Sequence, residues 1–334
     1  MLALGISQDL YGSGAAYSDG TRLLFAANEE RFSRIKNDGG YPTRCIERGL
    51  REIGADWADI THLCVCGVMT PPLPLRILPD LQRRFRESQS DRSAGAFKHF
   101  AEWVIDNTPI VHGAPGWWLS RVVKPFIPWA VRLHLPPALR HMPVQVIEHH
   151  RAHAACAYHL SGFYNALILT ADGMGDGVSV SVSAGRGGRI ERLDYTSSRD
   201  SIGLFFERLT EALGFIPNRD EGKLTGLAGS GDAGAVAVPT PFAVERGAIH
   251  YRGPQGLAAA NWLHDAVVAR HRREDVAAWA QHILEDCIAG VAAYWLRETG
   301  LTKLALAGGT FANVRLNQRI YEIPGVDDIF IAPN

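Results

Sequence analysis

The sequence predicts an α/β protein of two lobes, and three observations support this fold class. The 334 residues are enough to build two hydrophobic cores. Both strands and helices are predicted in each half of the chain. The first 68 residues read as three strands, a helix and a further strand, an order typical of a ribonuclease H-like unit.

The first lobe is predicted to cover residues 1–163. Its predicted strands are Leu2–Ser7, Ser13–Tyr17, Leu23–Ala27 and His62–Val68, with a hairpin turn at Ser18-Asp19-Gly20. A helix should begin at Pro42 and run to about Ile53, because proline is tolerated in a first helical turn. This lobe is interrupted by a segment of different composition.

Residues 70–142 form that segment, and we predict a mainly helical insertion. It is rich in proline, in tryptophan (Trp103, Trp117, Trp118, Trp129) and in basic residues (Arg76, Arg83, Arg84, Arg86, Lys98, Arg121, Lys124, Arg132, Arg140). One interpretation is a lid or partner surface that recognises the substrate. The other, which we favour, is a solvated helical cap whose aromatic side chains fill its own small core.

The second lobe is predicted to cover residues 164–334. Its strands run from Asn165 to about Leu193, broken at Gly185–Gly188, and a helix follows at Ile202–Leu213. Residues 228–256 should be irregular with one short hairpin. The remaining predicted elements are a long helix from about Ala259 to Thr299 with a break near Arg272–Glu274, a strand at Lys303–Ala307, a helix at Asn313–Tyr321 and a strand at Asp328–Ala332.

Composition excludes several classes of function. The net charge of -1 argues against non-specific binding to nucleic acid or membrane as the main function, and every apolar run is shorter than the roughly 18 to 20 residues of a membrane span. The N-terminus lacks the features of a signal peptide. Five cysteines without regular spacing fit a reducing, cytoplasmic environment, and Cys64 and Cys66 should lie on one face of a buried strand.

Two segments together suggest a metal site. His149 and His153 are four residues apart at the start of a predicted helix, so both imidazoles project from one face. Asp172 follows the predicted strand Ala166–Thr170 and should lie in a Gly-rich turn that also offers backbone N–H groups. Two imidazoles at this spacing can share one divalent cation. Taken alone, such a histidine pair is more often a surface or core feature.

Four further segments are candidates for binding an anion or a nucleotide. Arg31, Arg34 and Lys36 follow the third strand and could receive a phosphate. Glu221–Gly229 reads as a Gly-spaced loop, in which Glu221 could bind a ribose and Lys223 a phosphate. The Gly308-Gly309 turn precedes a helix beginning at Asn313, and the loop Gln8–Ser13 could place a phosphate against Ser13. Each segment, taken alone, also fits an ordinary turn.

Seven segments in this order resemble the NodU-type O-carbamoyltransferases, which act on nodulation factors, aminoglycosides and cephalosporins. They are Gly5–Ser7 through Ser13–Ala16, Glu29–Lys36, His149–Ala154, Asp172-Gly173, Ser201–Phe206, Glu221–Ala228 and Gly308–Asn313. The resemblance leaves residues 70–142 unmatched in detail.

The resemblance implies an actin-like ATPase fold of two ribonuclease H-like lobes, similar to the tRNA threonylcarbamoyl transferases. It implies a divalent metal, iron being expected and zinc the alternative, bound by His149, His153 and Asp172. It also implies carbamoyl-adenylate, made from ATP and carbamoyl phosphate in a separate C-terminal domain. The carbamoyl group would pass to a hydroxyl of a small-molecule natural product or sugar.

Further residue roles are expected from the same resemblance. Lys36 and His150 are the candidate catalytic residues, although His150 fits a structural role equally well. The candidate nucleotide-binding residues are Ser13, Arg34, Gly173, Gly175, Glu221, Lys223, Gly226, Gly308, Gly309 and Asn313. We expect a cytoplasmic protein with no membrane or nucleic-acid partner, and a homodimer is one open oligomeric state.

Two departures from the family pattern leave alternatives open. Tyr11-Gly12 stands where the family has His-Asp. The chain also ends at Asn334, where the family continues into an Asp-Gly segment with a further metal ligand and the adenylate-forming domain, so we do not expect it to make carbamoyl-adenylate alone. One alternative is a non-catalytic nucleotide-binding partner of the same fold. The other is an actin-like sugar kinase, which has little use for the histidine pair.

Overall fold

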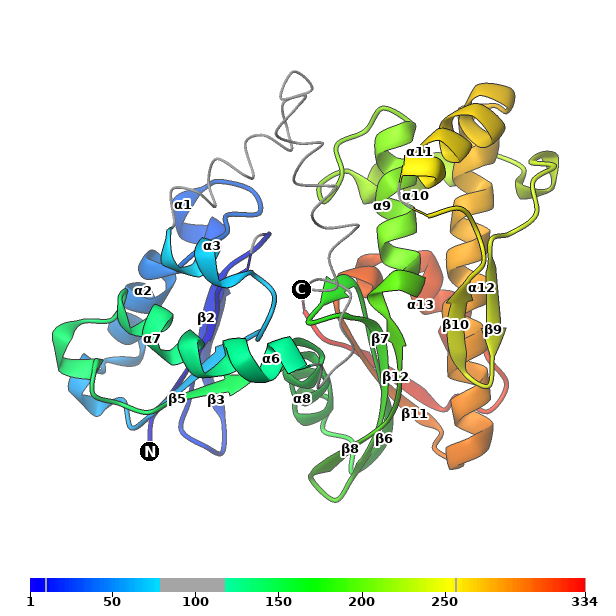
Figure 1. Ribbon diagram of the computed structural model, residues 1–334. Helices are drawn as coiled ribbons and strands as arrows, with labels where there is room; N and C mark the ends of the chain where they lie inside the picture. Colours follow the sequence, from blue (N-terminus) through cyan, green and yellow to red (C-terminus); the bar gives the residue numbers. More distant parts are fainter. Residues whose placement is uncertain (10, 79–117, 256, 334) are drawn as a thin grey trace. The chain divides into compact units, whose positions relative to one another are not determined.

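The protein folds into two compact units, Met1–His149 and His150–Asn334. The structure is a computed structural model that describes every residue except 10, 79–117, 256 and 334 (Figure 1). The sequence predicted the boundary between the two lobes at residues 163/164. The structure moves it to residues 149/150, because helix α8 (His149–Ser161), apart from its first residue, belongs to the second unit.

Unit 1 contains a five-stranded sheet of order β3-β2-β1-β4-β5. Its strands are β1 (Ala3–Ser7), β2 (Gly14–Ser18), β3 (Leu23–Asn28), β4 (His62–Cys66) and β5 (Val144–Ile147). The β1–β2 and β2–β3 pairs are antiparallel, and the β1–β4 and β4–β5 pairs are parallel. Leu63 and Val65 are buried on one face of β4, so Cys64 and Cys66 share the opposite, half-buried face.

Among its described residues, unit 1 has the helices α1 (Glu30–Ser33), α2 (Thr43–Ile53), α3 (Leu73–Ile77), α6 (Trp118–Val123) and α7 (Ile127–Arg132), with short 3₁₀ turns at Trp57–Asp59, Lys124–Phe126 and Pro137–Leu139. Helix α2 packs Ile46 and Leu50 into the core and ends at Gly54, whose φ of 67° allows the chain to leave the helix. The described part of the predicted insertion is helical, as expected. Its residues 79–117, with Trp103 and Trp117, lie outside the described residues.

Unit 2 repeats the strand order of unit 1. Its five-stranded sheet has the order β12-β11-β6-β7-β8. The strands are β6 (Asn165–Gly175), β7 (Val178–Arg186), β8 (Arg189–Ser197), β11 (Lys303–Ala307) and β12 (Asp328–Ile331). The first three strands pair antiparallel, while β11 pairs parallel with β6 and β12. Each unit therefore has the ribonuclease H-like topology, and the predicted actin-like ATPase fold is confirmed.

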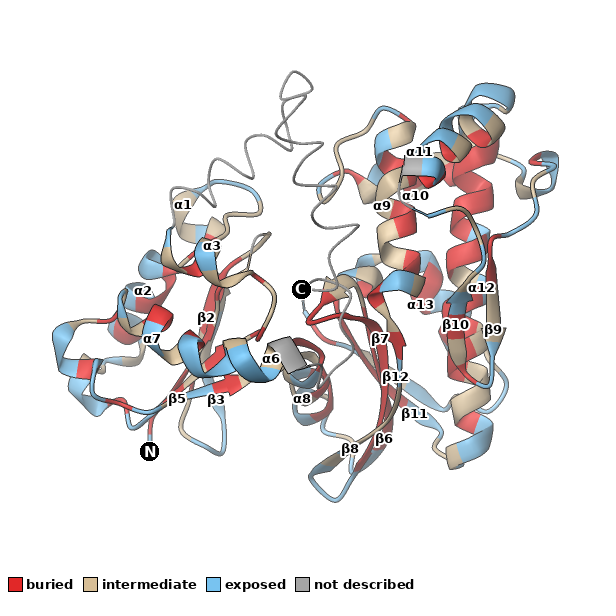
Figure 2. Ribbon diagram, viewed as in Figure 1, coloured by how far each residue is buried: buried red, intermediate tan, exposed pale blue. Residues whose placement is uncertain are grey.

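Helices cover both faces of the second sheet (Figure 1). Leu167 and Leu169 of β6 pack with α9 (Ile202–Ala212) and α12 (Arg273–Thr299), whereas Ala166 and Ile168 pack with α8. Burial therefore covers both faces of β6 and β7 and much of α12 (Figure 2). Unit 2 also contains α10 (Glu221–Ala228), α11 (Leu257–Trp262), α13 (Val314–Tyr321) and a hairpin of β9 (Phe242–Glu245) and β10 (Ala248–Tyr251).

Two predicted turns near the candidate site were wrong. Strand β6 continues through Gly175, so Asp172 lies on the strand, and the turn comes at Asp176-Gly177, both with positive φ. Glu221–Gly229 is not a loop, because residues through Ala228 form helix α10. Glycine disfavours a helix by about 1 kcal/mol, but packing of Leu224 and Ala228 against the unit 2 core outweighs that local preference.

Across the described part of the chain, no helix combines the length and apolar character that a bilayer span requires.

Candidate functional site

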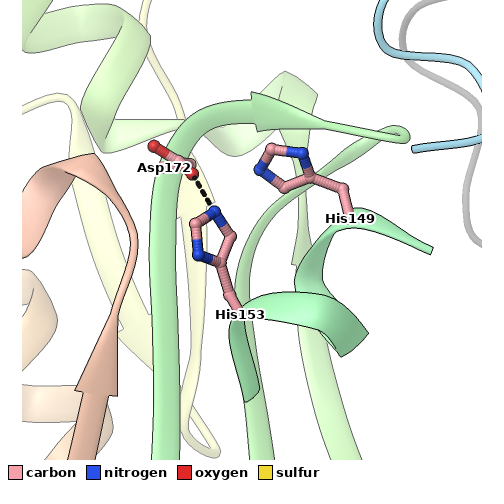
Figure 3. A group of neighbouring side chains, drawn as sticks. All are labelled: His149, His153 and Asp172. Carbon is pink, nitrogen blue, oxygen red and sulfur yellow. Dashed lines mark ion pairs between the residues drawn. The ribbon is translucent and has the colours of Figure 1, made fainter. Parts of the chain in front are cut away.

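The central feature of the site is a group of three potential metal ligands. His149 and His153 come from successive turns of α8 and Asp172 from β6, and their ligand atoms all lie within 4.8 Å of one another (Figure 3). The His153 Nε2 atom lies 3.0 Å from Asp172 Oδ2. His149 is buried, while His153 and Asp172 are half-buried. The three residues that the sequence proposed as ligands are thus brought together.

The packing of α8 explains this placement. Ala154, Ala157 and Tyr158 share a small core with β6 and β11, so the helix lies against the sheet. Gly185 of β7 makes room for the Tyr158 ring, because a Cβ there would lie 2.5 Å from Tyr158 Cδ2. Small alanines bring the helix close to the sheet, and its first turn then faces Asp172.

The donor set fits a divalent first-row metal. Two imidazoles and one carboxylate are the ligands of the facial-triad iron sites and of many catalytic zinc sites. Such sets leave coordination positions for water or substrate. The donor chemistry therefore allows metal-assisted catalysis as well as simple retention of an ion.

The turn after β11 orients the Asp172 carboxylate. The Gly309 backbone N–H donates a hydrogen bond of 2.9 Å to Asp172 Oδ1, which leaves Oδ2 facing His153. Gly308 has a φ of 106°, and a Cβ at this position would collide with the carbonyl oxygen of Ala171. Glycine is needed at position 308 for both reasons.

Helix α9 holds the neighbouring backbone, which sequence reasoning missed. The Ser201 hydroxyl donates to the Gly173 carbonyl over 2.6 Å and accepts from the Leu204 N–H, so it also caps α9. A Cβ at Gly203 would lie 2.8 Å from the Asp172 carbonyl oxygen. A serine before an amphipathic helix is the signal that could have identified this contact. Of the other predicted glycines here, Gly175 pairs with Val178 beside the turn.

His150 lies in a buried polar network rather than at the surface. Its Nδ1 is 2.7 Å from Thr170 Oγ1 and its Nε2 is 2.9 Å from the Val178 carbonyl oxygen. Because a carbonyl only accepts, Nε2 carries the proton, and Thr170 then reaches Ser181 Oγ at 2.7 Å. The side chain ties the first turn of α8 to β6 and β7.

The polar residues around α10 form their own network. Lys223 Nζ lies 3.0 Å from Asp220 Oδ2, and hydrogen bonds from Arg219 and Lys223 lower the pKa of Asp220. The Asn218 N–H donates to Glu221 Oε1 over 2.5 Å. A Cβ on Gly222 or Gly226 would meet nothing within 4 Å, so this helix face is open.

Asn313 and Glu207 complete the arrangement around α10. Asn313 caps α13 and donates to Thr225 Oγ1 and Gln281 Oε1. Glu207, which sequence reasoning missed, accepts a 2.5 Å hydrogen bond from Asn218 Nδ2. Burial, together with the negative charge of Glu221, raises the pKa of Glu207 to about 7.

The remaining predicted residues belong to unit 1. Ser13 is buried, and its hydroxyl donates to the Asp38 carbonyl over 2.9 Å. Arg34 ends α1 with a φ of 63°, and it is exposed, as is Lys36. Asp9, which was not predicted, has its Oδ2 atom 4.0 Å from His149 Nδ1. It is a single acidic residue in a loop and carries no pattern of its own.

Comparison with known proteins finds relatives that match most of this chain. The chain is 27% identical to the nodulation protein NolNO of Sinorhizobium fredii over 96% of its own length and 44% of that protein. It is 25% identical to MJ1051 of Methanocaldococcus jannaschii, over 96% of this chain and 53% of that protein. It is 31% identical to NolO of Bradyrhizobium diazoefficiens, over 56% of this chain and 35% of that protein. The chain thus spans about half the length, or less, of these relatives.

Among solved structures, component A of the (R)-2-hydroxyglutaryl-CoA dehydratase of Acidaminococcus fermentans matches with a TM-score of 0.48 and 11% identity, over 100% of this chain and 92% of that chain. The family model described as the carbamoyltransferase N-terminus matches residues 3–334. The chain therefore belongs to the carbamoyltransferase family, and it matches the N-terminal part of the proteins of that family.

Proposed function

We propose that this chain is the transfer domain of an O-carbamoyltransferase, which passes a carbamoyl group from carbamoyl-adenylate to a hydroxyl of a small-molecule natural product or sugar. The observation that carries the proposal is the group of His149, His153 and Asp172 within a chain of this family. In the reaction, the acceptor hydroxyl oxygen forms a bond to the carbamoyl carbon and loses its proton, the bond from that carbon to the phosphate oxygen breaks, and AMP leaves.

A divalent metal, iron or alternatively zinc, would be held by these three side chains and would polarise the carbamoyl oxygen as a Lewis acid. The surrounding residues hold the ligands ready. Gly309 fixes one oxygen of Asp172, and Ser201 fixes the backbone just after it. Such preorganisation lowers the cost of assembling the site.

We assign His150 a positioning role rather than that of a proton acceptor. Its Nε2 proton is donated to a main-chain carbonyl, and its Nδ1 faces Thr170 in a fully buried position. A general base must reach the acceptor hydroxyl directly or through one water. Of the two residues expected to be catalytic, this leaves Lys36, which is exposed on unit 1, as the candidate for contact with the donor.

The nucleotide is proposed to bind along α10 and the glycine turns of unit 2. The open face at Gly222 and Gly226 allows close approach to the helix, Glu221 would accept from a ribose hydroxyl, and Lys223 would face a phosphate. Gly173, Gly175, Gly308, Gly309 and Asn313 are proposed to line the same region. Ser13 and Arg34 of unit 1 are proposed to meet the anionic part of the donor.

Synthesis of carbamoyl-adenylate from ATP and carbamoyl phosphate is proposed to lie in the part of the enzyme beyond this chain. The relatives support this division, because the chain spans 44% of NolNO and 53% of MJ1051.

Metal content tests the proposal first. Elemental mass spectrometry on the wild type should find close to one iron or zinc per chain. The His149→Ala/His153→Ala double variant should lose it, and His159→Ala, an exposed histidine of the same helix, should retain it. Equal metal in the wild type and the double variant would reject the site.

Supplied carbamoyl-adenylate tests the chemistry. Metal-loaded wild type should release AMP faster when sugar or aminoglycoside acceptors are added, and the double variant should not. Tight nucleotide binding without acceptor-dependent AMP release would instead identify a non-catalytic partner of the same fold.

A further inference from the structure

Arg76 is the largest fully buried side chain of the described residues, although its basic neighbours in the sequence suggested a solvated cap. Its guanidinium donates to the carbonyl oxygens of Pro71, Cys66, Gly67 and Thr70 over 2.9–3.2 Å. Gly67 has a φ of 85°, and a Cβ there would collide with the Thr70 carbonyl oxygen. The segment after β4 is thus wrapped around one cation.

Arg76 also forms a reciprocal pair with Gln8, which is 68 residues away in the sequence. Arg76 Nη1 donates to Gln8 Oε1 over 3.4 Å, and Gln8 Nε2 donates to the Arg76 carbonyl oxygen over 3.1 Å. His134 Nε2 lies 2.8 Å from the same carbonyl. Gln8 is buried, so this pair holds the beginning of the β1–β2 loop inside the unit 1 core.

The residue after Gln8, Asp9, lies near the His149 side chain of the same unit. Asp9 Oδ2 lies 4.0 Å from His149 Nδ1, and the Asp9 carbonyl accepts from the Gly40 N–H over 2.9 Å. At 4.0 Å the Asp9 carboxylate lies beyond hydrogen-bond distance of the ring. Loss of a hydrogen-bonded carboxylate partner typically weakens metal binding about 10- to 100-fold, so we expect an effect at the lower end of that range here. A displacement of Gln8 would therefore reach His149 through Asp9.

A buried cation is a costly way to stabilise a core. Taking a charge out of water costs several kcal/mol, and an apolar side chain of the same volume is often as stable. The fork of an arginine, however, fixes the directions of five donors at once. This favours a role in setting geometry over a role in stability alone.

We infer that Arg76 is a positioning residue that acts through Gln8 and keeps the Asp9 carboxylate beside the His149 imidazole. The inference rests on the proposed function in one respect, because it gives Arg76 a role at His149, a ligand of the proposed metal site. All the contacts that it uses lie within unit 1. It can therefore be tested in the metal-free protein.

The test uses Gln8→Met, which removes the reciprocal pair while leaving the carbonyl contacts of Arg76 intact, and Arg76→Lys, which keeps the charge without the fork. Arg132→Met is the matched control, because Arg132 in the same unit donates to a single carbonyl, that of Met142, over 3.0 Å. Circular dichroism confirms that each variant is folded.

Two readouts on the metal-free protein decide the inference. The first is hydrogen exchange at the Gly40 backbone amide, which should become about tenfold faster in Gln8→Met and Arg76→Lys. The second is the NMR signal of the His149 ring, assigned by its loss in His149→Gln. In both variants this signal should move towards the position it has in Asp9→Asn. Gln8→Met should add little shift in the Asp9→Asn background, since contacting residues are coupled. An unchanged Gly40 exchange rate and ring signal in Gln8→Met, or fully additive shifts, would overturn the inference.

Titration with Co²⁺ then connects the inference to the proposed function. Gln8→Met should bind Co²⁺ about tenfold more weakly than wild type, and Arg132→Met should bind it equally well. A wild type that binds no Co²⁺ while the two metal-free readouts respond would reject the metal site and leave the positioning role standing. Unaltered Co²⁺ affinity in Gln8→Met, with binding by the wild type, would overturn the effect on His149.

Discussion

The first connection of each sheet shows how differently two copies of one topology can be built. In unit 2, β6 and β7 continue into a tight turn at Asp176-Gly177, and Asp172 lies on the strand itself. In unit 1, β1 and β2 are joined by the loop from Gln8 to Ser13, which carries Asp9. The strand orders are otherwise the same.

The two connections are therefore held by different forces. The sheet ladder, α8 and the Gly308-Gly309 turn fix Asp172 largely through backbone contacts. The β1–β2 loop depends on side chains far away in the sequence, above all Arg76. Ligands on regular elements are placed more accurately than ligands on loops, unless a loop is braced. The difference teaches that the three candidate ligands lie on a helix and a strand, whereas the β1–β2 loop of unit 1 needs a buried brace.

The largest expected effect tests the backbone frame of unit 2. Gly308→Ala should lower the free energy of unfolding by about 4 kcal/mol, because it combines backbone strain with a collision against Ala171. Gly300→Ala is the control: it also has a positive φ but meets nothing within 4 Å, so it should cost about 1 kcal/mol. Chemical denaturation measures both, and equal losses would show that the close approach of the two backbones is unimportant.

The second prediction tests the attachment of α8 to the sheet. His150→Phe should cost about 3 kcal/mol, because the Val178 carbonyl and the Thr170 hydroxyl lose buried partners. His159→Phe, at an exposed position of the same helix, should change stability by less than about 0.5 kcal/mol. A His150→Phe protein as stable as wild type in urea would show that α8 is held by apolar packing alone.

The third prediction concerns an ionisable group of unit 2. Glu207 has a pKa raised to about 7, so its contribution to stability is present below its ordinary pKa and is lost as the pH rises through about 7. Glu207→Gln should therefore stabilise the protein relative to wild type, by about 2 kcal/mol more at pH 8 than at pH 5.

Thermal unfolding at the two pH values measures this difference. Glu298→Gln, an exposed substitution on α12, is the control and should change stability by less than about 0.5 kcal/mol at either pH. If the gain in stability from Glu207→Gln did not depend on pH, the Glu207 carboxylate would not be buried beside the negative charge of Glu221.

The smallest expected effect tests the long-range support of unit 1. Helix α2 has no side-chain cap of its own; instead, Glu29 accepts from the N–H groups of Arg44 and Cys45 over 3.1 and 2.7 Å. Glu29→Ala should cost about 1 kcal/mol, as for the loss of an N-cap. Glu52→Ala, which removes an exposed pair with Arg48, should cost about 0.3–0.5 kcal/mol. If Glu29→Ala and Glu52→Ala had the same urea midpoint, the contacts of Glu29 with the first turn of α2 would contribute nothing measurable to stability.

Local patterns predicted most of the secondary structure. Strand β1, the proline before α2 and the break before α12 all lie where the sequence placed them. The failures are at Asp172 and Glu221–Ala228, where glycines suggested turns. Glycine is permissive rather than directive, so the pairing of β6 with β7 and the packing of α10 decided the outcome.

The sequence by itself determined most of the strand and helix order, the family resemblance and the candidate ligands His149, His153 and Asp172, because helical spacing is a local property and the ligand motifs lie within short segments. Only the tertiary structure decided the burial of His150, the role of Gly309 and the bracing of Gln8 and Asp9 by Arg76. Those contacts join residues far apart in the chain, and a hydrogen bond between distant residues leaves no periodic trace in the sequence.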